Sequence, residues 1–279
     1  MTLVGILNID KPVGWTSHDV VARVRRVAGE RRVGHAGTLD PLASGVLPVL
    51  LGRATRLAEL IHAYSKTYVA EVRLGVATST GDAEGAVTEE QPVPSPLQLD
   101  AVLGQFRGDI LQVPPAYSAV KVAGQRAYAV ARAGGAVTLE ARYVIIHSIH
   151  VLATDPLTLE VTCGTGTYIR SLARDIARAL GTVGHLTSLV RTRVGPFQLS
   201  EAAALDGLDV AQSLLAPDAA MPEAPTWSLT GEDADRVAHG QSVAVAGLHA
   251  DPVRVYDPQG RLVCLARADG ERLYPRLML

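Results

Sequence analysis

The sequence predicts an α+β fold with a small β-domain at its C-terminus, and three segments carry this prediction. Residues 66–76 place apolar side chains at alternate positions, as in a half-buried antiparallel strand. Residues 166–181 repeat apolar side chains at helical spacing. Residues 213–225 contain three prolines and predict a linker, after which short strand patterns begin.

The N-terminal segment 3–30 predicts a short strand, a turn and a helix. Thr16 or Ser17 can cap this helix, and Gly29 can end it. The expected apolar stripe of the helix consists of Val20, Val24 and Val27.

Two helices and two strands are expected between residues 66 and 181. The strand 66–76 turns Tyr68 and its alternate neighbours inward, and 157–163 predicts a second strand. Residues 97–106 can form a short helix. The helix over 166–181 ends at Gly181, and its apolar stripe consists of Ile169, Leu172, Ile176 and Leu180.

A separate small β-domain is expected after the linker. Asp257, Pro258 and Gly260 fit the first, second and fourth positions of a type I turn between two strands. We therefore expect a large domain over residues 1–222 and a small one over 223–279.

The composition is that of an ordinary globular protein, with 48% hydrophobic and 19% charged residues. The N-terminus lacks the pattern of a signal peptide, and the apolar run 46–51 is far shorter than the roughly 18 residues of a membrane span. Cys163 and Cys264 are too far apart in sequence to suggest a disulfide framework or zinc spacing. We expect a cytoplasmic protein that binds neither a metal nor a membrane.

The net charge of −2 conceals an uneven distribution. Residues 1–73 hold ten lysines and arginines against six acids, and residues 121–197 hold nine against four. The segments between and after them are acidic. Two basic segments can together bind a phosphate backbone, although scattered solvated arginines explain the charge equally well.

Asp40 is the first candidate for chemistry. It precedes Pro41, which disfavours helix, and it lies in a loop with Gly34, Gly37 and Gly45 that can approach a ligand closely. A turn aspartate that caps its own loop is the simpler explanation. The functional alternative is a nucleophile or general base.

Arg170 is the second candidate, because it falls in the first turn of the helix over 166–181. A cation there opposes the helix dipole at a cost of roughly 0.3–1 kcal/mol, so it needs an anion beside it. Asp40 is our candidate for that anion. A guanidinium would hold the carboxylate in place.

Other side chains are less specific. Tyr68 is a core residue unless a pocket opens there, in which case it can stack on a base. His35 shares the loop of Asp40, so a hydrolase that uses both residues is an alternative, but no oxyanion motif accompanies them. No dinucleotide-binding or phosphate-loop motif is present, and His147 and His150 are poorly spaced for a metal.

Several motifs together resemble the TruB family of tRNA pseudouridine synthases over nearly the whole chain. They are LNIDKPVGWTSHDVV, GHAGTLDPLASGVLPV, KTYVAEVRLGVATSTGDAEG, FRGDILQVPPAYSAVKVAGQRAYAVARAG, GTYIRSLARDIARALG and HLTSLVRTRVGPF. The resemblance implies a pseudouridine synthase fold, with a large mixed, mainly antiparallel sheet and a PUA-like RNA-binding domain at the C-terminus. It also implies isomerisation of the T-loop uridine 55 of tRNA, after base flipping and without a cofactor.

The resemblance assigns roles by position. Asp40 would be the catalytic aspartate, and Arg170 would pair with it. Tyr68 would be a catalytic residue that stacks on the target base and assists the final proton removal. Lys11, Pro12 and Gly37 would support the active site. The expected contacts with the substrate RNA are His35, which would enter the T-loop stack, and Asp82, Tyr168 and Leu189 around the flipped nucleotide.

Residues 118–134 would form a mobile basic arm that closes on the RNA, with Lys121, Arg126 and Arg132 on its phosphates. The expected partner is the T-arm stem-loop of tRNA, bound by a monomer that needs no protein partner. A non-catalytic module that binds or folds RNA is the alternative function. Asp40 argues against that alternative, since a carboxylate repels phosphates.

Overall fold

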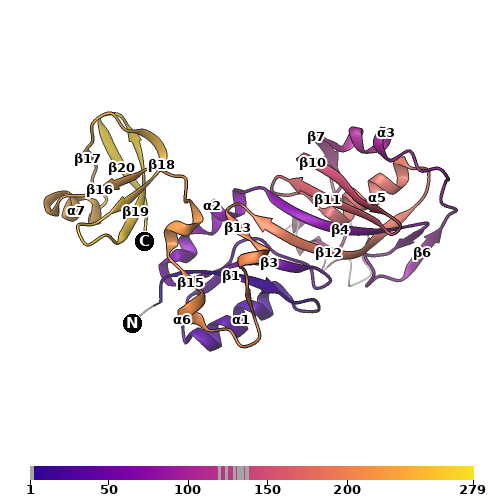
Figure 1. Cartoon of the computed structure of the whole chain (residues 1–279), viewed down its shortest axis with the longest axis horizontal. Helices are drawn as coiled ribbons and strands as arrows, with labels where there is room; N and C mark the ends of the chain where they lie inside the picture. Colours follow the sequence, from indigo (N-terminus) through magenta and orange to yellow (C-terminus); the bar gives the residue numbers. More distant parts are fainter. Residues whose placement is uncertain (1–2, 119–120, 123–124, 128–129, 131–134, 136–137) are drawn as a thin grey trace.

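The computed structural model describes residues 3–118, 121–122, 125–127, 130, 135 and 138–279. Figure 1 shows a large unit built on one long sheet and a small C-terminal sheet at one end of the molecule. No helix in these described ranges is long and apolar enough to cross a membrane.

The large unit contains an 11-stranded mixed sheet whose main path runs β14-β1-β3-β12-β4-β11-β10-β7. The pairs β1/β14 and β3/β12 are parallel, and the other pairs are antiparallel. The strands of the main path are β1 (Gly5–Lys11), β3 (Ser44–Leu51), β4 (Lys66–Leu74), β7 (Gly108–Gln112), β10 (Arg142–Thr154), β11 (Leu157–Cys163), β12 (Gly184–Val194) and β14 (Ala203–Ala204). Paired at their sides are β2 (Val33–His35), β13 (Phe197–Gln198) and β15 (Leu214–Leu215).

Two helices cover separate parts of this sheet. Helix α1 (Ser17–Ala28) packs on β1 and β3, and α5 (Ile169–Ala179) packs on β4 and β11. The shorter helices are η1 (Gly52–Leu57), α2 (Ala58–Ala63), α3 (Leu99–Leu103), η2 (Gly104–Phe106), η3 (Leu199–Glu201), α6 (Val210–Ser213) and η4 (Pro217–Ala220). Two small hairpins join β5 (Val76–Thr78) to β6 (Val87–Glu90) and β8 (Lys121–Val122) to β9 (Gln125–Arg126).

Local sequence explains where the helices begin and end. Thr16 and Asp19 form a reciprocal capping box on α1, and Gly29 ends that helix with a φ of 62°. The predicted stripe of α1 is wrong at Val27, which is exposed, and Val21 is buried in its place. Helix α5 begins at Ile169, later than its pattern predicts, because residues 164–168 form the loop that borders a pocket.

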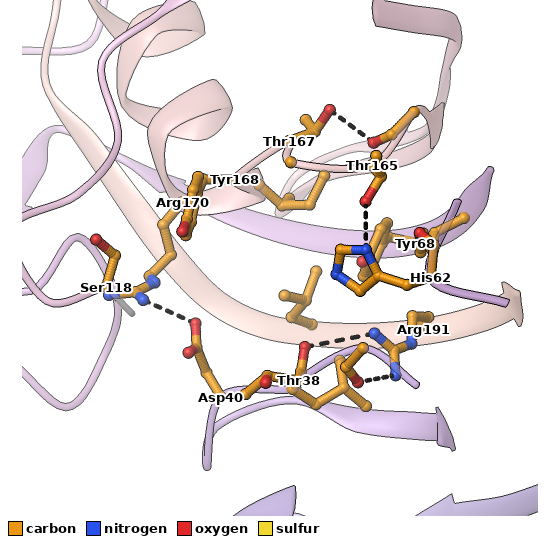
Figure 2. A pocket seen from close by; sticks show the side chains of 17 residues that line it. Thr38, Asp40, His62, Tyr68, Ser118, Thr165, Thr167, Tyr168, Arg170 and Arg191 are labelled. Carbon is orange, nitrogen blue, oxygen red and sulfur yellow. Dashed lines mark hydrogen bonds and ion pairs between the residues drawn. The ribbon is translucent and has the colours of Figure 1, made fainter. Parts of the chain in front are cut away.

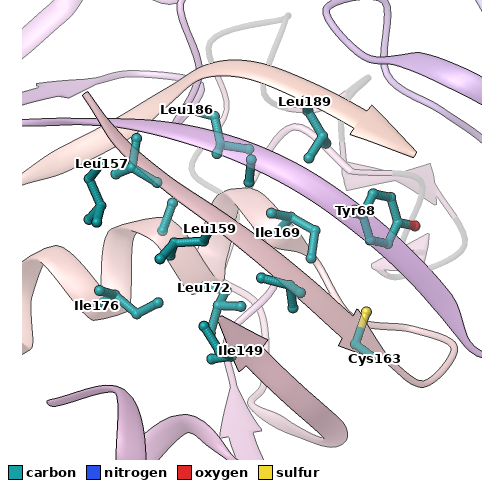
Figure 3. Packing of buried hydrophobic residues seen from close by; sticks show 14 of the residues in the cluster. Tyr68, Ile149, Leu157, Leu159, Cys163, Ile169, Leu172, Ile176, Leu186 and Leu189 are labelled. Carbon is teal, nitrogen blue, oxygen red and sulfur yellow. The ribbon is translucent and has the colours of Figure 1, made fainter. Parts of the chain in front are cut away.

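Figure 3 shows the apolar side chains of β4, β11 and α5 meeting in one core. Tyr68 and Leu189 lie at the edge of this core, at the floor of a pocket. The inward face predicted for the strand over 66–76 is therefore confirmed, and it ends at a cavity.

The small unit is a five-stranded sheet with its own core. Its elements are β16 (Thr226–Ser228), α7 (Gly231–Ala238), β17 (Val243–Ala244), β18 (His249–Tyr256), β19 (Leu262–Asp269) and β20 (Arg272–Met278). The Gly260 N–H donates to the Asp257 carbonyl at 2.9 Å. This bond closes the turn that the sequence predicts between two strands.

The linker predicted over 213–225 is mostly folded onto the large unit. Strand β15 pairs with β1, and Ala220 and Met221 are buried. The Tyr64 hydroxyl donates to the Ala220 carbonyl at 2.6 Å. Pro217 begins η4, and Pro225 directly precedes β16, so the prolines here flank short elements and do not mark a free connection.

Gly45 pairs with Arg191 where β3 contacts β12. We expect Gly45→Ala to lower the free energy of unfolding by about 2–5 kcal/mol. Its φ is +100°, and an added Cβ would lie 2.2 Å from the Arg191 carbonyl oxygen. Urea unfolding followed by the fluorescence of Trp15, in a Trp227→Phe background, measures this in the large unit.

Gly14→Ala is the matched control, since Gly14 has a φ of +83° with no other atom near the added Cβ. It should cost only about 1–2 kcal/mol of backbone strain. Equal losses in the two variants would contradict a close approach of β3 to β12.

Candidate active site

Two adjoining cavities share Asp40 and Arg170 at their boundary. The smaller cavity, of about 250 Å³, is bordered by the loop of Asp40, β4, β12 and residues 164–170. The larger one, of about 920 Å³, opens on the other side toward His35 and Asp82. The pair therefore faces both a pocket and a groove.

Arg170 joins segments that are distant in sequence. Its Nη2 lies 2.9 Å from Asp40 Oδ2 and donates to the Tyr117 carbonyl at 2.8 Å. Its Nη1 donates to the Thr80 carbonyl at 3.0 Å and lies 3.5 Å from Asp82 Oδ2. The structure brings Asp40 and Arg170 together, and Figure 2 shows the pair at one side of the smaller pocket.

Asp40 and Asp82 differ in their surroundings although they share one guanidinium. The side chain of Asp40 is 40% exposed, whereas that of Asp82 is 4% exposed. The other oxygen of Asp82 accepts bonds from the Thr80 hydroxyl and from the Glu84 N–H. Asp82 thus binds both Arg170 and its own loop. The second oxygen of Asp40 has no partner among the described residues.

The loop of Asp40 is held from beneath by Lys11 and Ser17. The buried Lys11 Nζ donates to the carbonyls of Pro12 and Trp15 at 2.9 and 2.7 Å and lies 3.5 Å from the Pro41 carbonyl. Burial lowers the pKa of Lys11 to about 8. The Leu39 N–H donates to the Ser17 hydroxyl at 2.9 Å. The Lys11–Pro12 segment thus lies under the loop and does not enter the pocket.

Tyr68 and Leu189 form an apolar floor. They lie on neighbouring strands, where Tyr68 is opposite Arg191 and Leu189 is opposite Ala70. Burial raises the pKa of Tyr68, and the nearby Arg191 opposes this shift. Tyr68 is therefore an uncharged ring at neutral pH, suited to face contact with a planar ligand.

His35 lines the larger cavity from the end of β2. Among the described residues, its Nδ1 has no hydrogen-bond partner. Burial lowers the pKa of His35 below its usual 6.5, and nearby Arg191 adds to this. The ring is mostly neutral at pH 7 and can enter a stack of bases without a charge.

Two further predicted residues border the smaller pocket. Tyr168 precedes α5, and its N–H donates to Gln112 Oε1 at 2.9 Å. Gly37 has a φ of +100°, and its carbonyl accepts a bond from Arg191 at 3.0 Å. The positive φ lets that carbonyl point inward.

Three ionisable residues of the pocket were not predicted as site residues, namely Lys66, Arg191 and His62. Lys66 and Arg191 lie on β4 and β12 and are 5% and 1% exposed. Their positions gave one usable signal: each is two residues from an inward-facing side chain, Tyr68 or Leu189. No local pattern could have indicated His62, which reaches the pocket from α2.

The predicted arm is described only in part. The backbones of Lys121 and Arg126 pair in the β8/β9 hairpin, and Arg132 lies outside the described residues. The predicted phosphate contacts of these three side chains therefore stay predictions. Elsewhere in the described chain, no three histidine, cysteine or acidic side chains gather as a metal ion would require.

Family sequence models match consecutive parts of the chain. Residues 25–169 match the N-terminal domain of the TruB family pseudouridylate synthases, and residues 170–221 match the tRNA pseudouridylate synthase B C-terminal domain. Residues 225–277 match the C-terminal domain of tRNA pseudouridine synthase II.

Curated proteins named tRNA pseudouridine synthase B align over most of the chain. The protein from Thermobifida fusca (strain YX) is 48% identical, and the alignment covers 94% of each chain. That from Mycobacterium tuberculosis (strain ATCC 25618 / H37Rv) is 45% identical, over 96% of this chain and 93% of the relative.

Solved structures share the fold. A chain of an H/ACA RNP bound to a substrate RNA containing 2′-deoxyuridine superposes with a TM-score of 0.73 at 27% identity, covering 98% of this chain and 84% of that one. A chain of a Cbf5–Nop10–Gar1 complex gives 0.73 at 28% identity, with 99% and 84% covered. The expected large mixed sheet with a separate C-terminal β-domain is confirmed.

Lys11→Met is expected to lower the free energy of unfolding of the large unit by about 2–4 kcal/mol, because buried carbonyls would lose their donor. The urea unfolding measurement used for Gly45 applies. Arg26→Met is the control, since Arg26 is exposed on α1 and its loss should change stability by less than about 0.5 kcal/mol. A Lys11 variant as stable as the control would refute the support assigned to Lys11.

Proposed function

The chain belongs to the TruB family of tRNA pseudouridine synthases, and we propose that it isomerises uridine 55 in the T-loop of tRNA. The observation that carries this proposal is the Asp40–Arg170 ion pair at the boundary of a pocket and a groove. The pocket would take the flipped uracil, and the groove would take the adjoining backbone of the RNA.

The reaction breaks the bond from C1′ of the ribose to N1 of uracil and remakes it to C5. The proton on C5 is lost and N1 gains one, so no external donor or acceptor is consumed. The uridine must first leave its stack, which costs a few kcal/mol. Contacts with phosphates and a stacking aromatic ring can offset that cost.

Asp40 is the proposed catalytic residue. A carboxylate can start the reaction by attacking the base, by attacking the sugar or by removing a sugar proton, and each route needs it beside the glycosidic bond. Its partial exposure at the mouth of the pocket supports this role, since one oxygen stays open while the other is held by Arg170.

Arg170 would keep Asp40 aimed at the nucleotide. The carbonyls of Thr80 and Tyr117 fix the guanidinium plane, and the buried carboxylate of Asp82 adds a second anion. We therefore assign Asp82 a positioning role in addition to its proposed contact with the flipped nucleotides. A planar fork of donors does this better than a single ammonium group.

The remaining proposed contacts divide between the two cavities. Tyr68 and Leu189 would hold the faces of the uracil, with Tyr168 at the rim. His35 would fill the space that the extruded nucleotide leaves in the T-loop, because its neutral ring faces the larger cavity. We propose that Lys121, Arg126 and Arg132 contact phosphates, and that a monomer acts on tRNA without a protein partner.

Asp40→Asn should leave RNA affinity within about threefold and lower the single-turnover rate constant by about 10³-fold or more. The rate is followed by tritium release from a T-arm stem-loop that carries 5-tritiated uridine, and affinity is measured by filter binding. Turnover within tenfold of wild type would contradict the proposed role. A stem-loop with cytidine at position 55 tests which uridine is modified. Tritium release from this stem-loop would come from another uridine and would contradict the assignment of uridine 55.

Arg170→Lys should slow the same reaction by about 10²-fold, because a point charge aims the carboxylate poorly. Arg178→Lys is the control, since Arg178 is exposed near the end of the same helix. The double variant of Asp40 and Arg170 should lose much less than the product of the single losses. Additive losses would mean that the two residues act independently.

A further inference from the structure

Two buried cations lie at the floor of the smaller pocket without an acidic partner. Lys66 and Arg191 both line this pocket, and each is at least 95% buried. Among the described residues, neither side chain takes part in an ion pair. Burying an unpaired charge costs several kcal/mol per ion, and here two like charges are close together.

Backbone carbonyls accept hydrogen bonds from only some of the N–H groups of Lys66 and Arg191. Lys66 Nζ donates to the carbonyls of His62 and Tyr64 at 2.5 and 2.6 Å, which leaves one of its three N–H bonds. Arg191 donates to the carbonyls of Val46, Gly37 and Thr38 at 2.7, 3.0 and 3.4 Å. A guanidinium has five N–H bonds, so two have no backbone carbonyl as partner among the described residues.

Arg191 lies on the other side of the pocket from Asp40. Figure 2 shows Asp40 with Arg170 at one side and Arg191 with His62 and Tyr68 at the other. Lys66 and Arg191 extend from the two strands that carry Tyr68 and Leu189, the proposed contacts of the base. A uracil on this floor would have the anionic residue toward its ribose and the cationic residues toward its ring.

The proposed reaction places a negative charge on that ring. When the N1–C1′ bond breaks, its electron pair passes to uracil and spreads over N1, O2 and O4. The pair is used again when C5 bonds to C1′, after which C5 loses its proton and N1 gains one. If Asp40 attacks C6 instead, electrons still move onto the ring oxygens. All three routes thus make the base transiently anionic.

We propose that Lys66 and Arg191 stabilise this anionic uracil, as electrostatic catalytic groups distinct from the Asp40–Arg170 pair. The inference rests on the function proposed above and adds to it the groups that would lower the barrier to bond breaking. Fixed cations in a site shielded from water act strongly on charge that develops during a reaction. Arg191 holds the carbonyls of Gly37 and Thr38 in the loop of Asp40, whereas Lys66 holds carbonyls outside that loop, so Lys66 is the better residue to vary.

The titration of Lys66 gives the inference a second test. Burial, with Arg191 adding to it, lowers the pKa of Lys66 to about 8. The other groups around it stay neutral there: Cys163 has a pKa of about 11, the pKa of Tyr68 is raised, and that of His62 is lowered. Lys66 is charged below pH 8 and loses its charge above it, so kcat/KM should fall as pH rises through about 8.

The experiment compares wild type, Lys66→Met and Lys66→Arg in single turnover on stem-loops with uridine or 5-fluorouridine at the target position. Fluorine at C5 withdraws electrons and stabilises a negative charge on the ring. The 5-fluorouridine substrate therefore depends less on a cation of the protein. Loss of the nucleoside is measured by nuclease digestion and mass spectrometry. Circular dichroism checks folding, and Arg73→Met is the control, since Arg73 is exposed on β4.

Lys66→Met should slow uridine turnover by about 10²-fold at saturating RNA. Its deficit should shrink by about tenfold on the 5-fluorouridine stem-loop. Lys66→Arg should stay within about tenfold of wild type and lose the fall near pH 8, because arginine remains charged.

Equal deficits of Lys66→Met on the two stem-loops would overturn the inference, since a merely structural role cannot depend on the leaving group. A wild-type chain that forms no pseudouridine would instead refute the proposed function, and the inference with it.

Discussion

The guanidinium of Arg170 is the point on which the architecture of the site depends. It lies in the first turn of α5, where a cation opposes the helix dipole, and it is 6% exposed. Two carboxylates and two carbonyls, all from other segments of the chain, offset that cost. The same contacts set the position of Asp40. The Arg170 side chain, although unfavourably placed in its helix, thus connects four segments of the chain.

Charged side chains of both signs surround Arg170. The exposed carboxylate of Asp40 lies at the boundary of the two cavities, and Arg170 and Asp82 lie behind it. Lys66 and Arg191 line the same pocket, on the strands that carry Tyr68 and Leu189. The net charge of −2 reveals nothing of this order. Local electrostatics are determined by which few side chains are buried together.

Sequence reasoning found Arg170 because a cation at a helix N-terminus is unfavourable without an anion beside it. Asp40, in its glycine-bracketed loop, was the anion matched to it. Lys66 and Arg191 were not found in this way. A cation in a strand is not unfavourable by its position in the strand, and it becomes so only when tertiary packing buries that face. Arg170 also has partners at Thr80 and Tyr117 that no helical pattern indicates. The start of α5 and the folded segment after residue 213 depend on tertiary packing in the same way.

The order of strands in the large sheet has a consequence for synthesis of the chain. Strand β12 lies between β3 and β4, which are neighbours in sequence but do not pair with each other. Until residues 184–194 have left the ribosome, both strands present an unpaired edge, and such edges recruit other strands. The two halves of the pocket, one carrying Asp40 and the other Tyr68, become parts of one sheet only when β12 enters. Assembly of the site is therefore a late event of folding, set by long-range contacts that form slowly.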